Sequence, residues 1–353
     1  TYTGTYNIRK DGVVELLTSG TIVFLEPKVI DVFMVGGGGA GGYQSGSGPR
    51  GSGGGGGGYT RTVRRINTVA NQSYQIQVGA GGTVNTSGMG NDGASSAFNN
   101  FTVSGGNHGE NDTSFAGGAG GSGGGGGVRS NSDYGTGGSN GNDGENGYPD
   151  TNAGGNGQGY TTREFGETTG KLYGGGGGGG RYMVSSTPIV SMGGAGGGGA
   201  GGWRSDTGGT YQAAAAGVAN TGGGGGGGVR LTAAHYVIAA SGGSGIVCFR
   251  DAQELPELAG TWVLNERLYA TNNFNETVNC SVKLGDGTAH DITRIEDNGT
   301  QITFYRNTSR LYRFTYSSQA WGSNNVVKSI TFPTGATASD EFRAWLASNA
   351  SKQ

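Results

Sequence analysis

The sequence predicts a mainly β protein of two domains, the first combining a β framework with a bundle of polyglycine II helices. Three observations lead to this fold class. Glycine accounts for 82 of the 353 residues and recurs in unbroken runs. Strand-like apolar segments precede and follow these runs, and the composition becomes ordinary beyond them. We therefore expect one domain over residues 1–251 and a second over residues 252–353.

Glycine runs organise the first domain. They occupy residues 36–39, 53–58, 123–127, 174–180, 196–199 and 222–228. A run without side chains buries no hydrophobic surface, and glycine loses more backbone freedom on ordering than any other residue. Each run is therefore either a flexible linker or part of a structure held by backbone bonds. In the polyglycine II form, which has three residues per turn, the N–H and C=O groups point outward to neighbouring runs.

The energetics of a glycine run favour several runs folding together. Fixing one backbone costs about 1–2 kcal/mol, while a net hydrogen bond returns about 0.5–1.5 kcal/mol. An isolated run therefore stays disordered. Only in a run that is bonded on several sides can the hydrogen bonds offset the entropy lost on ordering the backbone. Linkers mix Gly with Ser over long stretches, whereas these runs are bounded by residues such as Val35, Tyr59, Tyr173 and Val229. This pattern favours the bundle.

Strand-like segments bracket the glycine runs and are expected to clamp them. Residues 5–9 and 13–17 flank Asp11-Gly12, which is a hairpin signal. Residues 29–35 are almost all apolar, as expected for a strand buried on both faces. Other strands are expected at residues 21–25, 59–66, 73–78, 101–104 and 246–250.

The second domain is expected to be a small antiparallel β domain with a C-terminal helix. Its strands are predicted at residues 260–264, 274–284, 292–297, 301–305 and 326–332. Thr337 and Asp340 resemble a capping box, and Phe342, Trp345 and Leu346 follow helical spacing. In the first domain, four consecutive alanines within residues 211–216 indicate either a short helix or a small-residue loop.

An ordered series of motifs in the first domain resembles the glycine-rich domain family. The motifs are DVFMVGGGGA from Asp31, GGYTR ending at Arg61, YQIQVGAGG from Tyr74, GASSAF from Gly93 and GSGIV from Gly243. The family is widespread in tailed-phage tail proteins and gut-bacterial proteins. It is similar to the extracellular glycine-rich region of anaplastic lymphoma kinase and, more loosely, to phage adhesins and the springtail antifreeze protein. The resemblance implies a jelly-roll-like framework that carries polyglycine helices over about residues 5–250.

The second domain resembles a small module of phage and Firmicutes proteins. The likeness rests on Gly260-Thr261-Trp262 at the start and on FxxWLxxNA from Phe342 at the end. Such modules often form the C-terminal end of tail or baseplate proteins, so the resemblance supports a viral origin.

Composition excludes several classes of protein. The net charge of −2 without a basic cluster argues against a nucleic-acid partner. No apolar run approaches the length that crosses a bilayer, so no membrane insertion is expected. Cys248 and Cys280 do not make a disulfide framework and are expected to be buried or reduced thiols. The glycine runs lack the Gly-Lys-Ser/Thr of phosphate loops, so no cofactor is expected.

Candidate catalytic and metal-binding residues are few. Cys248 and His235 could form a nucleophile–base pair, but a small apolar thiol on a buried strand is the favoured interpretation. Asp143 and Glu145 loosely resemble a calcium loop, but the ordered oxygen ligands of an EF-hand are missing, so a solvated turn is favoured. We expect neither a catalytic site nor a metal site, and therefore no enzyme.

The candidate ligand-binding residues lie in the loops between glycine runs. Tyr, Trp and Arg on loops are frequent binding anchors. The alternative is that some of these side chains pack against the outside of the bundle and stabilise it. The candidates are Tyr134, Tyr148, Tyr160, Arg163, Phe165, Tyr182, Trp203, Arg204 and Tyr211.

These features predict a non-enzymatic tail-fibre or receptor-binding protein of a phage virion. Its partners would be a host-surface glycan or protein and other virion tail proteins, and a homotrimer is a further expectation. The alternative is a bacterial cell-surface or extracellular binding module. An ice-binding protein is a third hypothesis, which the bulky loop residues disfavour.

Overall fold

The computed structural model contains two compact units, Thr1–Ala252 and Gln253–Gln353, and each is described by itself. It describes residues 1–43, 50–85, 90–111, 115–127, 163–167, 170–183, 190–205, 210–232, 235–252, 255, 257–265, 274–298, 301–315 and 326–353. Strands dominate both units, and the single α-helix among these residues lies in the second unit. The predicted mainly β class with a C-terminal helix is confirmed.

Two antiparallel sheets form the framework of the first unit. The five-stranded sheet has the order β1-β2-β15-β4-β6, and the four-stranded sheet has the order β3-β7-β8-β9. Their bounds are Tyr6–Ile8 for β1, Val14–Leu16 for β2, Gly20–Val23 for β3, Val29–Val35 for β4, Thr60–Asn67 for β6, Ser73–Gln77 for β7, Ser96–Phe98 for β8, Phe101–Val103 for β9 and Ile246–Asp251 for β15. Strand β15, from the end of the unit, lies between β2 and β4, so strands from before and after the glycine segments share one sheet.

Strand β4 is buried on both faces, as its apolar run predicted. Met34 belongs to a hydrophobic core that residues of both sheets form, and this core also contains Tyr74 and Phe98. Phe33 belongs to a second cluster on the other face, where its ring centroid lies 5.2 Å from that of Tyr173. Tyr173 immediately precedes the seven-glycine run 174–180, so side-chain packing on β4 fixes the place at which that run starts.

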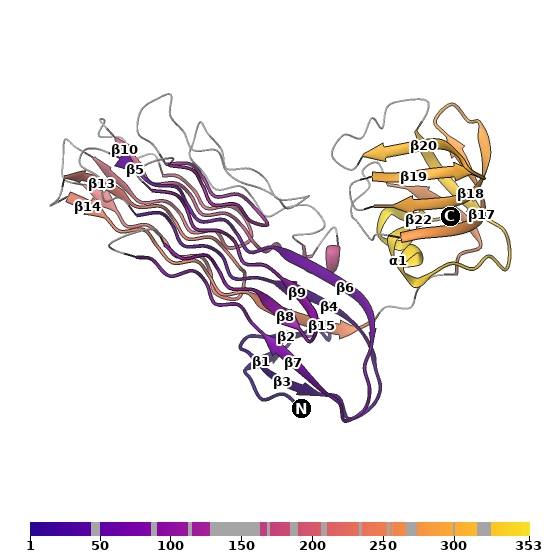
Figure 1. Ribbon diagram of the computed structural model, residues 1–353, viewed down its shortest axis with the longest axis horizontal. Coiled ribbons are helices and arrows are strands. Elements are labelled where there is room, and N and C mark those ends of the chain that lie inside the picture. Colours follow the sequence, from indigo (N-terminus) through magenta and orange to yellow (C-terminus); the bar gives the residue numbers. More distant parts are fainter. Residues whose placement is uncertain are drawn as a thin grey trace. The chain divides into compact units, whose positions relative to one another are not determined.

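Backbone hydrogen bonds between the glycine segments repeat every three residues. Along residues 36–42, every third N–H group donates to residues 53–59. The N–H groups between them donate in turn to residues 91–94 and to residues 240–243. Successive amides therefore point in three directions, which is the period that three residues per turn would produce. In Figure 1 these segments run side by side away from the framework strands.

Residues 52–58 lie at the centre of the glycine segments. They exchange backbone hydrogen bonds with six neighbouring segments, namely residues 36–42, 104–110, 116–121, 122–127, 174–180 and 222–228. The neighbours approach so closely that a Cβ added to Gly57 would lie 1.8 Å from the carbonyl oxygen of Gly174. Gly53–58 have no left-handed φ angle. Contact with neighbouring backbone, and not local conformation, is therefore what excludes side chains here.

The short helix considered for residues 211–216 is wrong. The Ala215 N–H donates to the Ala200 carbonyl at 2.8 Å, and the Gly226 N–H donates to the Ala215 carbonyl at 3.0 Å. These bonds join separate segments, whereas a helix would satisfy the same groups within one turn. Four alanines have high helix propensity, but a neighbouring glycine backbone offers competing partners that local propensity does not reveal.

The second unit is a seven-stranded antiparallel sheet with a helix on one face. The order is β20-β19-β18-β17-β21-β16-β22. The bounds are Gly260–Leu264 for β16, Phe274–Leu284 for β17, Ala289–Asp297 for β18, Gln301–Arg306 for β19, Ser309–Thr315 for β20, Val327–Phe332 for β21, Asp340–Asn349 for α1 and Ala350–Lys352 for β22. Strands β20 and β22 were not predicted from the sequence.

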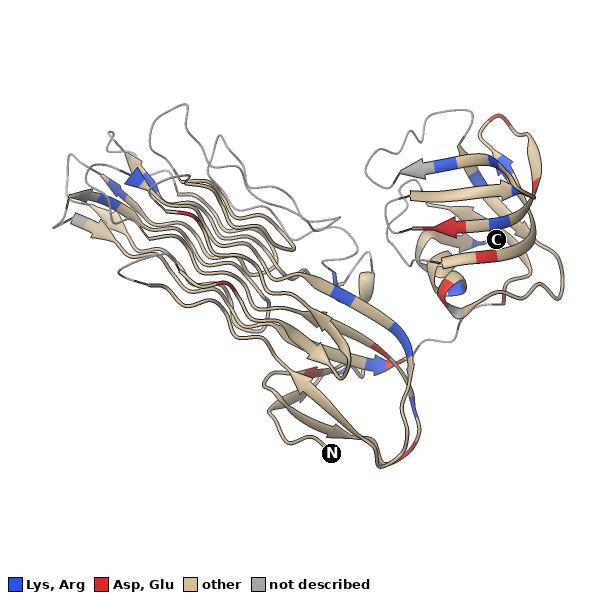
Figure 2. Cartoon of the chain, viewed as in Figure 1, with Lys and Arg blue, Asp and Glu red and all other residues tan. Residues whose placement is uncertain are grey.

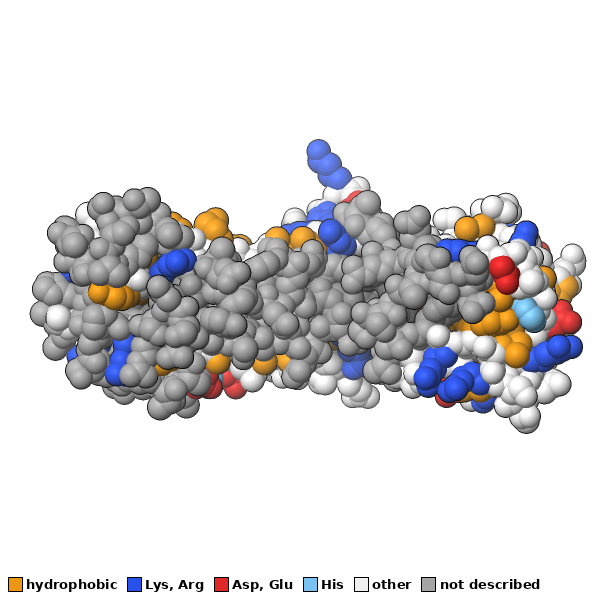
Figure 3. All heavy atoms as spheres, turned by 90° about the horizontal axis from the view of Figure 1, so that it is seen from above, with side chains coloured by type: hydrophobic (Ala, Val, Ile, Leu, Met, Phe, Trp, Pro, Cys, Tyr) orange, Lys and Arg blue, Asp and Glu red, His pale blue; other side chains and the backbone are white. Residues whose placement is uncertain are grey.

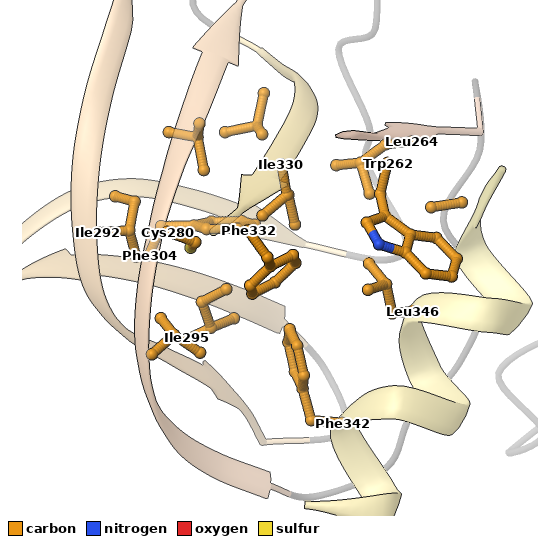
Figure 4. Packing of buried hydrophobic residues seen from close by; sticks show 14 of the residues in the cluster. Trp262, Leu264, Cys280, Ile292, Ile295, Phe304, Ile330, Phe332, Phe342 and Leu346 are labelled. Atoms are coloured by element: carbon orange, nitrogen blue, oxygen red, sulfur yellow. The ribbon is translucent and has the colours of Figure 1, made fainter. Parts of the chain in front are cut away.

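Helix α1 packs its predicted apolar face into this core, as Figure 4 shows for Phe342 and Leu346. The Phe342 ring lies against Phe274 and Phe332, with centroid distances of 5.4 and 5.9 Å. The predicted cap is wrong by two positions. Ser339 is the N-cap, and its hydroxyl accepts a hydrogen bond from the Phe342 N–H at 3.3 Å.

Candidate functional site

Two three-stranded sheets lie at the end of the glycine segments opposite the framework (Figure 1). Their orders are β10-β11-β12 and β14-β13-β5, and we call these six the distal strands. The bounds are Arg50–Gly51 for β5, Arg181–Met183 for β10, Trp203–Ser205 for β11, Tyr211–Gln212 for β12, Val229–Thr232 for β13 and His235–Val237 for β14. Four predicted ligand-binding residues lie together on them, namely Tyr182, Trp203, Arg204 and Tyr211.

Tyr182, Arg204 and Tyr211 form one row across the first of these sheets. Arg204 is the register partner of Tyr182 in the β10–β11 pair and of Tyr211 in the β11–β12 pair. Residues directly opposite each other in paired strands project from the same face. The Arg204 guanidinium carbon lies 5.3 Å from the centroid of the Tyr211 ring, and Tyr211 is 62% exposed. The row therefore presents a cation against an exposed aromatic ring.

Trp203 occupies the adjacent row and is buried. Its register partners are Arg181 and Gln212, and its Nε1–H donates to Gln212 Oε1 at 2.9 Å. The indole is only 8% exposed, so the expectation that Trp203 is an exposed ligand contact is wrong. The indole donor is already satisfied, and the ring projects from the face of the sheet opposite to Arg204, the next residue of the strand. Burial also lowers the pKa of Arg181 below its usual range.

A second row, which the sequence did not reveal, crosses the other distal sheet. Arg230 is the register partner of Arg50 in the β13–β5 pair and of Tyr236 in the β13–β14 pair. Tyr236 is 47% exposed. Two arginines thus stand directly opposite each other beside an exposed tyrosine, an arrangement in which like charges repel.

Backbone hydrogen bonds hold the two distal sheets together. The Gly180 N–H donates to the Ser52 carbonyl at 2.8 Å, and the Ser52 N–H donates to the Gly228 carbonyl at 3.0 Å. The Gly202 N–H donates to the Gly227 carbonyl at 2.9 Å. Each bonded segment reaches an arginine within two residues of these bonds. The arginines gathered in this way are Arg50, Arg181, Arg204 and Arg230.

The distal strands carry positive charge without acidic residues. They contain four arginines and no Asp or Glu, and Figure 2 shows basic residues gathered at this end of the first unit. Asp206 follows β11 in the sequence and lies outside the described residues. Folding brings together arginines that are scattered in the sequence from residue 50 to residue 230. The available signal was that each arginine stands within three residues of a stretch of glycines.

The remaining predicted ligand-binding residues do not join the distal strands. Tyr134, Tyr148 and Tyr160 lie outside the described residues. Arg163 and Phe165 lie at the framework, where the Arg163 guanidinium donates to the Gly170 carbonyl at 2.8 Å. Phe165 is 1% exposed, so its prediction as an exposed contact is wrong.

Phe165 is buried because it covers the outer face of β4. Its ring centroid lies 6.1 Å from that of Phe33, and the Arg250 guanidinium carbon lies 4.2 Å from its centroid. The neighbouring Glu164 is also buried. One Arg9 nitrogen donates to both Glu164 oxygens at 2.8 and 2.6 Å, and the Tyr173 hydroxyl donates to Glu164 at 3.1 Å. These contacts anchor the segment that leads into the glycine run 174–180.

The described residues offer little for catalysis or metal binding. Cys248 is buried and free, and burial raises the pKa of its thiol well above the usual value, which keeps it protonated. The side chain of His235, and all of Asp143 and Glu145, lie outside the described residues. Among the residues described, no three His, Cys, Asp or Glu side chains are close enough to share a metal ion. No described helix has the length and apolarity to cross a bilayer.

Comparison with known proteins gives one finding for the first unit. A family model described as a glycine-rich domain matches residues 18–251, which includes every framework strand from β3 onward and all the distal strands. Comparison with curated proteins gives no significant match.

Proposed function

Because the chain belongs to the glycine-rich domain family, we propose that it is a non-enzymatic receptor-binding component of a phage tail. Its distal strands would contact a glycan or protein on the host surface. The glycine segments, as polyglycine II helices in a jelly-roll-like framework, would be the scaffold that carries them. The second unit would assemble with other virion tail proteins.

The observation that carries this proposal is the row of Tyr182, Arg204 and Tyr211. Tyr and Arg are frequent binding hot spots because they combine large contact area with directional hydrogen bonding. Tyr211 is 62% exposed although it lies on a short strand with a fixed register. An exposed position on a strand does not bury the aromatic ring within the protein. Its exposure therefore favours a binding partner that covers the ring.

The glycine segments support the proposal by making the row stiff. Residues 52–58 make backbone hydrogen bonds to six surrounding segments. The distal strands are therefore attached to segments that are hydrogen-bonded to one another on several sides. A rigid support lowers the conformational entropy lost on binding. Trp203 adds to this support, since its indole is buried on the face of the sheet opposite to Arg204 and donates to Gln212.

Binding of the purified full chain to bacterial cells tests the proposal. We expect the chain to sediment with a subset of strains in a panel, and the double variant Tyr182→Ser/Tyr211→Ser to lose this binding. The matched control is Tyr6→Ser, which removes a tyrosine that is 51% exposed on framework strand β1. Unchanged binding of the double variant, or no binding to any strain, would contradict the proposal.

A further inference from the structure

Strand β20 is an open edge of the sheet in the second unit. Among the described strands its one neighbour is β19. The backbone N–H and C=O groups that point away from β19 therefore have no strand to bond. Proteins often blunt such edges by keeping them very short, whereas β20 has seven residues, Ser309–Thr315. An edge of this length is a template on which an extended peptide can add as a further strand.

The outer face of the sheet at this edge, opposite helix α1, is basic. Strand register places Arg313 opposite Thr303, and it places Arg310 opposite Tyr305. Phe304, which lies between Thr303 and Tyr305 in the sequence, belongs to the core that contains residues of α1. Alternate residues of a strand project from opposite faces, and paired residues share a face. Arg310 and Arg313 therefore stand together on the outer face, and a β-bulge in β20 accommodates their odd spacing.

Arg294 extends this basic face onto strand β18. It is the register partner of Tyr305 in the β18–β19 pair, and its guanidinium carbon lies 3.7 Å from the centroid of the Tyr305 ring. Stacking on a ring holds a guanidinium in place and leaves the donors at its planar edge available. Among the described residues its carboxylate neighbour is Glu296, at 3.8 Å. The face thus has one weakly paired cation behind the two arginines of the edge strand.

The arginines of β20 are exposed, and no residue in the described part of the chain pairs with them. Strands β19 and β20 together contain three arginines and no Asp or Glu. Figure 3 shows basic side chains gathered beside hydrophobic ones on the second unit. Charges on an edge strand oppose pairing between copies of one chain, because two β20 strands would bring arginines against arginines. The same charges attract a strand of opposite charge.

We propose that β20 binds an acidic, extended segment of a partner protein by strand addition. The backbone of that segment would bond the open edge, and Asp or Glu side chains at alternate positions would pair with Arg310 and Arg313. Arg294 would add to the positive field on the same face. This inference rests on the proposed function, because it names the surface and the partner chemistry by which the second unit would assemble with another protein.

A nucleic acid is the competing polyanion. Sheets that bind single-stranded nucleic acids stack bases on exposed aromatic rings. Tyr305 is half-buried, and Arg294 already stacks on its ring. The open backbone edge is also a feature that a peptide uses and a nucleic acid does not. These observations favour the acidic peptide.

Binding of the full chain to short labelled peptides tests this inference. The probe is a peptide in which Glu alternates with Val. The comparison probes are the same peptide with a central Pro, the same peptide with Lys in place of Glu, and single-stranded DNA. We expect the Glu-Val peptide to bind at least about tenfold more tightly than the Pro peptide, which cannot complete a strand. Its affinity should fall as salt rises, because counterions screen the arginines.

Hydrogen exchange locates the bound peptide. The amides of Ser309–Thr315 should exchange more slowly in the complex, because strand addition bonds the open edge. Failure of the Glu-Val peptide to bind, equal binding of the Pro or Lys peptide, tighter binding of DNA, or protection that leaves β20 unchanged would overturn the proposal.

Substitutions assign the binding to the two arginines of β20. Arg310→Gln/Arg313→Gln should weaken binding of the Glu-Val peptide by about five- to tenfold, since each exposed ion pair contributes modestly. The matched control is Lys283→Gln/Lys352→Gln, which removes two charges from strands β17 and β22 and should change affinity less than about twofold. Thermal melting of each variant establishes that the second unit is folded. Equal effects of the two double variants would overturn the assignment to β20.

The outcomes separate this inference from the proposed function. Binding to bacterial cells depends on the distal strands of the first unit, whereas peptide binding depends on β20. Cell binding without any binding of the Glu-Val peptide would overturn the strand-addition surface and leave host recognition standing. Peptide binding without binding to any bacterial strain would overturn host recognition and leave the β20 surface as a protein-binding site.

Discussion

The two units achieve stable packing in opposite ways. At the centre of the first unit, residues 52–58 contribute six glycines and one serine, and their contacts are backbone hydrogen bonds to six surrounding segments. In the second unit, Phe342, Trp345 and Phe304 are buried in one hydrophobic cluster. The interior of the first unit therefore consists of directional hydrogen bonds between backbone segments of fixed spacing. The interior of the second unit consists of side chains that can shift.

This difference determines how each interior tolerates change. A hydrophobic core relaxes around a smaller side chain and loses only part of its stability. Around residues 53–58 there is no side chain that could move aside, because a Cβ added to any of these glycines meets neighbouring backbone. The difference also determines where recognition residues can stand. Side chains are excluded from the central residues 53–58, whereas Arg204 and Tyr211 lie on the distal strands, beyond the glycine segments.

The largest expected effect is that of Gly57→Ala. The new Cβ would lie 1.8 Å from the Gly174 carbonyl oxygen and 2.3 Å from its carbon, so whole segments would have to separate. We expect the first unit to lose more than about 4 kcal/mol of unfolding free energy. Urea unfolding followed by circular dichroism measures it. Ala216→Ser is the control, because Ala216 is exposed. Wild-type stability of Gly57→Ala would show that these segments are not in contact.

Phe342→Ala is the corresponding change in the hydrophobic interior. It removes a fully buried ring that contacts Phe274 and Phe332 and should destabilise the second unit by about 3–5 kcal/mol. Three of the four tryptophans belong to this unit, so tryptophan fluorescence follows its unfolding. Ala347→Ser, exposed on the same helix, should cost less than about 1 kcal/mol. A matching loss in the first unit would mean that the two units unfold together.

The framework and the second unit were predictable where side-chain patterns specify structure. The apolar run of residues 29–35 predicted a strand buried on both faces, and Val32, Phe33 and Met34 are fully buried. The spacing of Phe342, Trp345 and Leu346 predicted the helix that packs into the second core. Strand β22 was missed because Ala350–Lys352 is short and largely exposed, and it is a strand only through pairing with β16.

The candidate site was only partly predictable, for a physical reason. Tyr182, Arg204 and Tyr211 were selected as aromatic and basic residues near glycine runs, and strand register brings them together. Arg50 and Arg230 were not, since they are 180 residues apart in the sequence and meet through bonds between featureless segments. Identical glycines carry no information on which segment neighbours which.

A third prediction concerns the side chains that anchor the start of the glycine run 174–180 to the framework. Glu164→Ala removes the carboxylate bound by Arg9 and leaves the buried Tyr173 hydroxyl without its acceptor. Breaking a buried ion pair typically costs about 3 kcal/mol or more, so we expect a loss near this value in the first unit. Glu167→Ala is matched to it, because Glu167 pairs with Arg250 but is 38% exposed on its side chain, and its loss should be below about 1 kcal/mol.

The result distinguishes two descriptions of the first unit. If Glu164→Ala and Glu167→Ala have equally small effects, backbone bonding alone sustains the glycine segments. If Glu164→Ala is as damaging as Gly57→Ala, the backbone bonds depend entirely on the side-chain anchor.

The smallest expected effect is a pH dependence confined to the second unit. Burial raises the pKa of Cys280 from an ordinary value of 9.0 to about 12. Below pH 9 the thiol is protonated in the folded and unfolded states, so stability is fully present. Above pH 9 the unfolded chain releases the proton while the folded unit retains it, and the unfolding free energy falls by about 1.4 kcal/mol per pH unit until about pH 12. Other groups titrate in this range, so the measured quantity is the difference between the wild type and Cys280→Ala.

We expect that difference to change by about 1 kcal/mol between pH 8 and pH 10, with the wild type losing more stability than Cys280→Ala. Fluorescence-monitored urea unfolding at the two pH values provides the measurement. The first unit should be unaffected by Cys280→Ala, since the substituted thiol belongs to the other interior. A pH-independent difference would place Cys280 in contact with water, and the sheet would then lack the tight side-chain packing that distinguishes it from the glycine segments.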